Sequence, residues 1–308
     1  MKKIKEQLPD TLYYYCSLDT FFNIIKNKSL WLTEIGKSND SLEQKYLATE
    51  IICNLKDYIK FRCEESVSKA EIERLQNEFY NKISTKHCSP VWAICFSEKE
   101  DDLSQWRGYA DDANGVCIGF STSYLNMINE LSDLCDNVQL NDCFRLRKIE
   151  YGEEAINNYL NFLSENFIPI ISANEIQEKL ERDLEGTYIR PYYKHAAFKS
   201  EAEWRMVYTK ITCEKEYRFN FKLLNSILEK NKKFHIIGRE YDTRNAFLQS
   251  HIELKIVDLL SAINVIYIGP KSKLTIEELV EFLRFSFGES KLEKDMPSIE
   301  YSSAFSYR

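Results

Sequence analysis

The chain has few of the residues that build flexible or repetitive proteins. Only 9 glycines and 6 prolines occur among its 308 residues, which excludes collagen-like and linker-rich architectures. The glycines are isolated, so no Gly-rich phosphate loop is present, and neither Gly-x-Ser-x-Gly nor His-Glu-x-x-His occurs. The sequence therefore lacks the motifs of P-loop proteins, Rossmann dinucleotide-binding proteins, α/β-hydrolases and zinc peptidases.

Positive charge and long apolar runs are also scarce. Lys and Arg number 41 against 48 Asp and Glu, and the formal net charge of −7 gives no general attraction to nucleic acid or anionic membranes, although a local basic groove stays open. No run approaches the ~18 apolar residues of a membrane span. A secretory signal has an apolar stretch after its first lysines, and residues 1–10 have none. We expect a cytoplasmic protein with no membrane partner.

Residues that bind metals are dispersed along the chain. There are 4 histidines and 9 cysteines, an odd number, with no close pair at metal-ligand spacing. We therefore expect no metal site, and we expect most thiols to act as small core residues in a reducing compartment.

What the sequence does have is a mixture of short strand and helix patterns, which predicts an α+β fold. The composition, 44% hydrophobic and 29% charged, is typical of a globular protein. Strands are expected at 12–16, 30–33, 91–97, 116–120, 145–151, 201–208, 217–221 and 265–268. Helices are expected at 18–28 (with Ser17 as N-cap), 103–109, 122–131 and 276–285.

No repeat and no shift in composition divides the chain, so we expect one domain over 1–308. The charged segment 41–88, which lacks Gly and Pro, carries helical periodicity and is predicted to be an insertion of two helices. A further helical segment is expected at about 153–190.

The most informative segment for chemistry is Glu201-Ala-Glu-Trp-Arg205. Because side chains alternate along a strand, Glu201, Glu203 and Arg205 are expected on one face, at a spacing of about 6.6–7 Å. This pattern fits a solvated strand face with paired charges. It also fits a carboxylate that stabilises a positive sugar carbon in a transition state, with Arg205 keeping the neighbouring acid ionised.

Aromatic and hydroxyl side chains end the other predicted strands and form the second group of candidates. Tyr13 and Tyr14 offer rings and hydroxyls that suit a nucleoside pocket, or they simply pack in the core. Ser97 ends a buried strand, where a hydroxyl can contact a ligand. Trp106 and Tyr109 share one face of a short helix and either anchor it or stack on a ligand ring.

Together these segments resemble a bacterial family known as domain of unknown function 2971. The matching motifs are Leu-Tyr-x-Tyr at 12–15, Asn-Asp-x-x-Glu at 39–43, Cys-Phe-Ser at 95–97, Trp-x-x-Tyr at 106–109, Gly-Val-x-Ile-x-Phe at 115–120, Lys-His-x-x-Phe-x-x-Glu-x-Glu-Trp-Arg at 194–205 and Ile-Gly-Pro-Lys at 268–271. They follow the family's order over nearly the whole chain.

The order of these elements is similar to the ADP-ribosyltransferase fold, a split β-sheet core with helices. The resemblance implies NAD as the substrate that donates ADP-ribose, with no metal. It implies Glu203 as the catalytic acid, with Glu201 as its partner. The cofactor-binding residues implied are Tyr13, Tyr14 (where many relatives carry His), Ser97, Trp106 or Tyr109, and Arg205.

The implied function is transfer of ADP-ribose to a macromolecular acceptor, protein or nucleic acid, by a bacterial toxin or anti-phage effector, with an antitoxin or inhibitor protein as a further partner. Two alternatives remain open. One is a non-catalytic nucleotide-binding module. The other is an RNA phosphotransferase-like enzyme of the same fold, with Arg190, Lys194, Lys199 and Arg205 as phosphate contacts.

Overall fold

The structure is a computed structural model of the whole chain. It describes residues 8–35, 46–62, 68–85, 91–137, 142–166, 190–210, 225, 233–244, 247–304 and 307. The expected Asn-Asp-x-x-Glu turn at 39–43, the strand at 217–221 and the helical region beyond 166 lie outside these residues.

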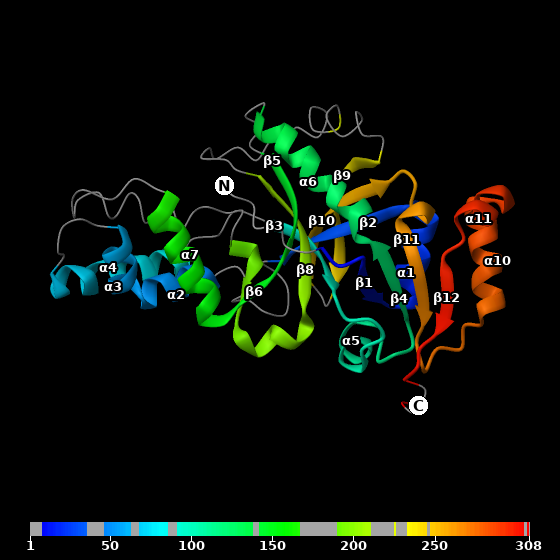
Figure 1. Cartoon of the computed structure of the whole chain (residues 1–308), viewed down its shortest axis with the longest axis horizontal. Coiled ribbons are helices and arrows are strands. Elements are labelled where there is room, and N and C mark those ends of the chain that lie inside the picture. The colour runs from blue at the N-terminus through cyan, green and yellow to red at the C-terminus, as the bar shows by residue number, and fades with distance from the viewer. Residues whose placement is uncertain are drawn as a thin grey trace.

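One large mixed sheet organises the described part of the chain (Figure 1). Its ten strands are β1 (Thr11–Cys16), β2 (Ser29–Glu34), β3 (Val91–Ser97), β4 (Val116–Ser121), β5 (Asp142–Lys148), β8 (Glu203–Lys210), β9 (Phe234–Arg244), β10 (Phe247–Ile256), β11 (Ile263–Ile268) and β12 (Ser298–Tyr301). The main path runs β12-β11-β4-β1-β3-β2-β10-β9, while β8 joins β3 to β5. The β11–β12 pair is parallel and the others are antiparallel, so the fold is α+β.

The sheet forks at β3. One edge of β3 pairs with β8 along its whole length, from Val91 to Ser97. Two strands share the other edge of β3. Strand β1 pairs with it at one point, where Tyr13 lies opposite Ser97, and β2 pairs with it only near Ala93. Strands β1 and β2 therefore diverge from opposite ends of β3. We call the space between them the fork.

Helix α1 (Leu18–Asn27) connects the two arms of the fork. Its N-cap is Ser17, whose hydroxyl accepts a hydrogen bond from the backbone N–H of Thr20 at 3.2 Å, as the sequence predicted. The helix ends where Lys28 adopts a left-handed conformation with φ of 55°. The buried face of α1 packs on the sheet together with α6 (Thr122–Asn137), α10 (Ile276–Phe287) and α11 (Glu289–Asp295).

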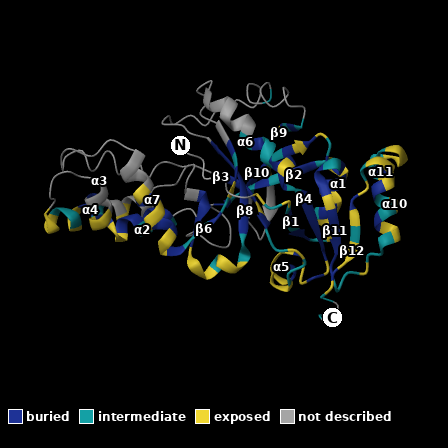
Figure 2. Cartoon of the chain, in the orientation of Figure 1, coloured by how far each residue is buried: buried dark blue, intermediate teal, exposed yellow. Residues whose placement is uncertain are grey.

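The opposite face of the sheet carries two smaller apolar clusters. Near β1 and β4, helix α5 (Leu103–Tyr109) packs through Trp106 on Tyr13 and Tyr15. Near β8, a second cluster joins β3 and β8 to α2 (Tyr46–Cys53), α3 (Leu55–Arg62), α4 (Lys69–Thr85) and α7 (Gly152–Asn166). Figure 1 shows these four helices gathered at one end of the molecule, and Figure 2 shows the buried strands between the layers.

Several boundaries differ from the sequence expectation. The segment after residue 41 contains three described helices instead of two, because a turn at Asn54 separates α2 from α3. The strand expected from residue 201 begins at Glu203. Strands β9 and β10 form a long antiparallel hairpin that the patterns did not predict, although Ile252, Leu254 and Ile256 alternate toward the core.

Candidate functional site

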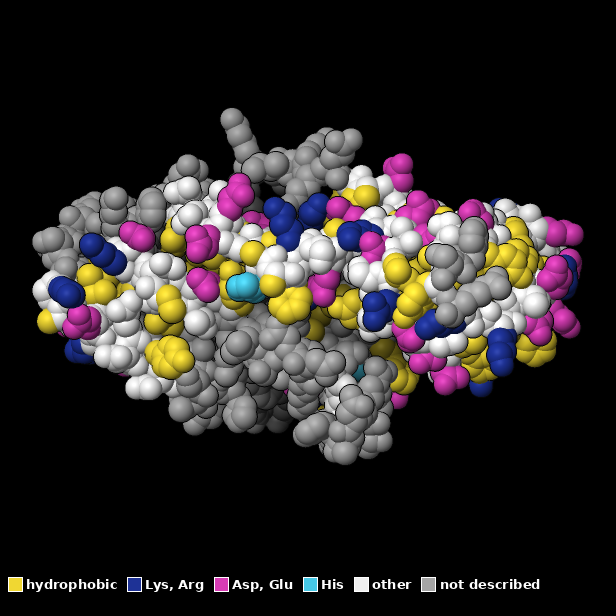
Figure 3. All heavy atoms as spheres, turned by 90° about the horizontal axis from the view of Figure 1, so that it is seen from below, with side chains coloured by type: hydrophobic (Ala, Val, Ile, Leu, Met, Phe, Trp, Pro, Cys, Tyr) yellow, Lys and Arg dark blue, Asp and Glu magenta, His cyan; other side chains and the backbone are white. Residues whose placement is uncertain are grey.

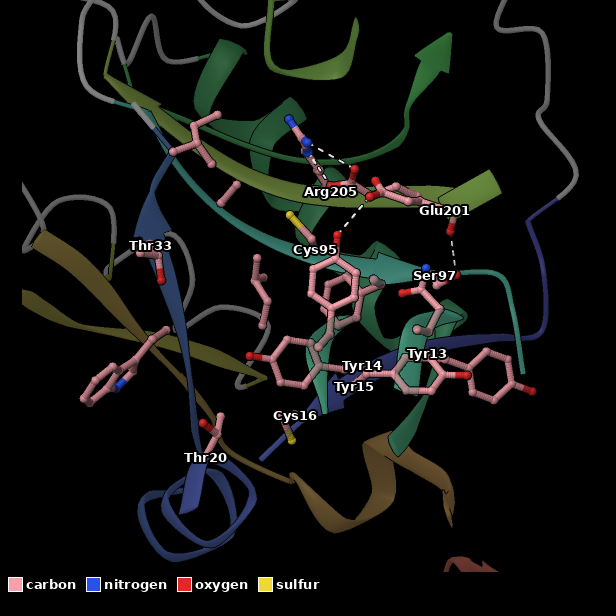
Figure 4. A pocket seen from close by; sticks show the side chains of 18 of the residues that line it. Tyr13, Tyr14, Tyr15, Cys16, Thr20, Thr33, Cys95, Ser97, Glu201 and Arg205 are labelled. Atoms are coloured by element: carbon pink, nitrogen blue, oxygen red, sulfur yellow. Dashed lines mark hydrogen bonds and ion pairs between the residues drawn. The ribbon is translucent and has the colours of Figure 1, made fainter. Parts of the chain in front are cut away.

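A cavity of about 610 Å³ opens in the fork. Its size lies within the range of about 300–1,000 Å³ that is usual for small-molecule sites. Its walls come from β1, α1, β2 and β3, with residues of β8 and of the 3-10 helix Ala196–Glu201 at one end. Among the predicted site residues, those that line the cavity are Tyr13, Tyr14, Ser97, Tyr109, Glu201, Glu203 and Arg205. Figure 4 shows Glu201 and Ser97 at one end and Thr33 and Thr20 at the other.

A buried ion pair forms one wall of the cavity. The Arg205 Nε lies 2.5 Å from Glu203 Oε1, and a second guanidinium nitrogen lies 3.1 Å from Oε2. Arg205 also donates to the backbone carbonyl of Pro191 at 2.8 Å. Glu203 and Arg205 are 5% and 1% exposed, so Arg205 is held by protein groups and positions the carboxylate.

Lys194 links the two glutamates. Its Nζ lies 2.7 Å from Glu201 Oε2 and 3.1 Å from Glu203 Oε2. The hydroxyl of Tyr109 donates to the other oxygen of Glu201 at 2.9 Å. Lys194 is itself only 6% exposed. Its positive charge stabilises the two carboxylates, which lie together in a site that excludes most water. The sequence indicated Lys194 only as a phosphate contact and gave no signal for this bridge.

The Glu203 carboxylate is ionised at neutral pH. Burial alone would raise its pKa, but the charge of Arg205 and its hydrogen bonds, the charge of Lys194 and a hydrogen bond from the Cys95 thiol lower the pKa to about 2. The expectation that Arg205 lowers the pKa of the neighbouring acid agrees with this geometry.

Glu201 reaches the cluster by a different route from the one expected. It is the last residue of the 3-10 helix, and it is not on the strand. Ala202 then turns the chain with φ of 46° and ψ of 50°, a left-handed conformation that is unusual for a residue with a Cβ. The Ser97 hydroxyl donates to the backbone carbonyl of Glu201 at 2.7 Å and fixes this turn to β3. The side chain of Ser97 is therefore engaged by the protein itself.

The tyrosines of β1 lie on both faces of the strand. Tyr13 and Tyr15 belong to the cluster under α5, while Tyr14 packs against Phe96 with ring centroids 6.0 Å apart. Burial and the nearby Glu100 carboxylate raise the pKa of Tyr13, so its hydroxyl stays protonated. Tyr14 is half-buried. Its ring and hydroxyl line the cavity.

Trp106 does not reach the cavity. It is fully buried, packs edge-on against Tyr15 at 5.0 Å between centroids, and donates from its indole nitrogen to Asp101 at 2.7 Å. Between the two aromatic candidates on α5, Tyr109 is the one that lines the cavity. Trp106 anchors the helix that presents it.

The far end of the cavity is polar and has little charge. It is lined by Thr20 and Asn23 of α1 and by Trp31, Thr33 and Glu34 of β2. The Trp31 ring stacks on His251 with centroids 3.8 Å apart, which holds the ring at the cavity wall. The sequence analysis did not single out Trp31, since one aromatic residue in a strand is usually a core residue.

The described lining residues do not form a basic groove. The lysine and arginine among them, Lys194 and Arg205, both bond carboxylates. Lys199 is exposed, and the side chain of Arg190 lies outside the described residues. Figure 3 shows basic and acidic side chains intermingled on one face of the molecule.

Two further features bear on the expected partners. Within the described residues, no group of three His, Cys, Asp or Glu side chains could hold a metal ion. None of the helices in the described ranges has the length and apolarity that a membrane crossing requires.

A family model matches part of the chain. No curated protein and no solved structure matches the chain. Residues 105–206 match the family model described as protein of unknown function (DUF2971). This segment runs from α5 to β8 and contains Tyr109, Lys194, Glu201, Glu203 and Arg205, the whole charged end of the cavity. In this segment, about a third of its length, the chain is similar to DUF2971 proteins.

Proposed function

We propose that the chain is an NAD-dependent ADP-ribosyltransferase whose substrate binds in the fork. The observation that carries the proposal is the Glu203 carboxylate, buried and ionised at one end of a cavity large enough for a small-molecule substrate. The fork supports it as well, because a split sheet is a feature that the resemblance to ADP-ribosyltransferases implies.

The proposed chemistry needs a fixed negative charge more than it needs an acid. Nicotinamide leaves NAD as a neutral molecule, and positive charge develops on the ribose ring as the bond breaks. An ionised carboxylate stabilises such a charge most strongly where water is excluded and the group is already oriented. Arg205 orients Glu203, and the Glu203 pKa of about 2 keeps the carboxylate charged while the bond to nicotinamide breaks.

The rest of the cavity offers groups suited to a dinucleotide. The rings of Tyr14 and Trp31 can stack on the sugar or base at the far end. The hydroxyl of Thr20, which lines the α1 wall, accepts from Ser17 and can donate its own proton to a phosphate oxygen. The nicotinamide ribose would then lie beside Glu203.

Glu201 is placed to act on the acceptor. Its carboxylate is less buried than that of Glu203, with side-chain exposures of 19% and 6%. Tyr109 and Lys194 hold one oxygen each. We assign Glu201 the task of orienting the nucleophile of a macromolecular acceptor, which in a toxin or defence effector would be a protein or nucleic acid under the control of an inhibitor protein.

The test is nicotinamide release and label transfer from labelled NAD, with cell extract as the source of acceptors. Glu203→Gln should abolish both activities. Glu98→Gln serves as the matched control, because Glu98 is also ion-paired, at 2.7 Å from Lys148, but does not line the cavity. Unchanged activity of Glu203→Gln would refute the residue assignment. Saturable NAD binding with no turnover in the wild-type protein would favour a non-catalytic nucleotide-binding module.

A further inference from the structure

Cys95 is the accessible residue in an otherwise buried part of β3. The other residues of this strand, from Val91 to Ser97, are all buried. Cys95 is exposed because the cavity opens onto its side chain. It pairs across the sheet with Arg205, so the two side chains lie on the same face, as Figure 4 shows.

The thiol belongs to the charged cluster of the site. It donates a hydrogen bond to the Glu203 carboxylate. That carboxylate is oriented in turn by Arg205 at 2.5 Å and by Lys194 at 3.1 Å. A nucleophile in contact with a base, and a base held by a third group, is the arrangement found where a side chain forms a covalent bond with a substrate. The two cations also favour sulfur reactivity.

We propose that Cys95 is an internal acceptor of the reaction, and that its sulfur takes the ADP-ribosyl group to form a thioglycoside inside the cavity. This inference rests on the proposed function. The bond from the ribose anomeric carbon to the nicotinamide nitrogen breaks, and its electron pair leaves with nicotinamide. A sulfur lone pair forms the new bond to that carbon, while the thiol proton passes to Glu203 and from there to water.

The weakness of Glu203 as a base favours attack on a sugar carbon over acyl transfer. A free thiol has a pKa of about 8.5, so Glu203, with a pKa of about 2, is too weak a base to produce a thiolate for attack on an ester or amide. A cationic sugar carbon does not need a thiolate. Once neutral sulfur has bonded to it, the S–H proton is strongly acidic, and Glu203 lies in position to accept it.

Self-modification would limit the protein to a single turnover whenever no other acceptor reaches the cavity first. A thioglycoside on Cys95 would leave ADP-ribose in the space that the next NAD molecule needs. The supply of the external acceptor would then decide between catalysis and self-inactivation.

The experiment incubates the purified full-length chain with NAD alone and measures intact mass and nicotinamide release in parallel. The wild-type protein should gain one ADP-ribosyl group, mapped to Cys95 by peptide analysis. Cys95→Ala should gain none and should release more than one equivalent of nicotinamide, because water then takes the ADP-ribosyl group and free ADP-ribose leaves the cavity. Cys53→Ala is the matched control, since Cys53 is an exposed thiol on α2 outside the cavity. It should behave as the wild-type protein does.

The two proposals fail in different ways. Nicotinamide release without mass gain, or mass gain at another residue, overturns the role of Cys95 and leaves the proposed function standing. Absence of release from both the wild-type protein and Cys95→Ala overturns both. A thermal melt of Cys95→Ala establishes that the variant is folded. Incubation with free ADP-ribose in place of NAD should add no mass to the wild-type protein, and addition at Cys95 would overturn the enzymatic origin of the adduct.

Discussion

Replacing Glu203 by Gln should cost stability as well as activity, because the ion pair is buried. The fall of the Glu203 pKa from its ordinary value of 4.5 to about 2 means that the folded protein favours the ionised carboxylate. Since one pKa unit corresponds to about 1.4 kcal/mol, the ionised group contributes about 3 kcal/mol to folding near neutral pH. A glutamine of the same shape lacks the charge that Arg205 and Lys194 require. We expect Glu203→Gln to lower the free energy of unfolding by about that amount.

The pH dependence of this loss has a definite sign. A carboxylate whose pKa is depressed in the folded state stabilises the protein fully above its unfolded pKa and progressively less as the pH falls toward the folded pKa. The difference between wild-type and Glu203→Gln proteins should therefore be constant above about pH 5 and shrink between pH 4.5 and pH 2.

Urea unfolding followed by circular dichroism, repeated at several pH values, measures this difference. Glu98→Gln is again the control. Its ion pair with Lys148 is partly exposed, with side-chain exposures of 28% and 40%. It should cost about 1 kcal/mol or less. A stability loss for Glu203→Gln that is the same at pH 3 as at neutral pH would refute the assignment of a depressed pKa to this carboxylate.

Three further substitutions test single contacts. Tyr109→Phe removes the hydroxyl that donates to Glu201 at 2.9 Å, and it should lower transfer to an acceptor about tenfold without changing the melting temperature, as label-transfer kinetics and a thermal melt would show. Trp106→Phe removes the donor to Asp101 and should cost about 1–3 kcal/mol in urea unfolding while leaving the dissociation constant for NAD unchanged; a large rise in that constant would contradict the structural role of this ring. Ala202→Gly relieves a left-handed backbone and should stabilise the fold by up to about 1 kcal/mol, whereas destabilisation in the same assay would show that Ala202 is not strained.

Local patterns were enough to predict the parts of the site that depend on one element. Alternation along a strand predicts that Glu203 and Arg205 share a face, and the structure has them in contact at 2.5 Å. A polar residue before an apolar helix predicts the Ser17 cap. In each case the information lies within a few residues of sequence.

The remaining features depend on contacts between distant segments. Whether Trp106 or Tyr109 faces the cavity is decided by how α5 packs on β1, and Asp101 holds Trp106 on the buried side. Cys95 lies in an apolar sequence that is typical of a buried strand. Its thiol is accessible only because β1 and β2 diverge beside it. The β9–β10 hairpin was missed because β9 carries charged residues between its apolar ones, which weakens the alternation.

The divergence of β1 and β2 also leaves main-chain groups facing the cavity. Between the pairings at Ala93 and Ser97, residues 94–96 are bonded along one edge to β8, and no described strand pairs with their other edge. Backbone N–H and C=O groups alternate in direction along a strand, so at least one of these residues presents both groups to the open edge. A ligand there can form hydrogen bonds that no side-chain substitution removes. Alanine scanning would not detect these backbone hydrogen bonds. Amide-to-ester replacement in β3 would detect them.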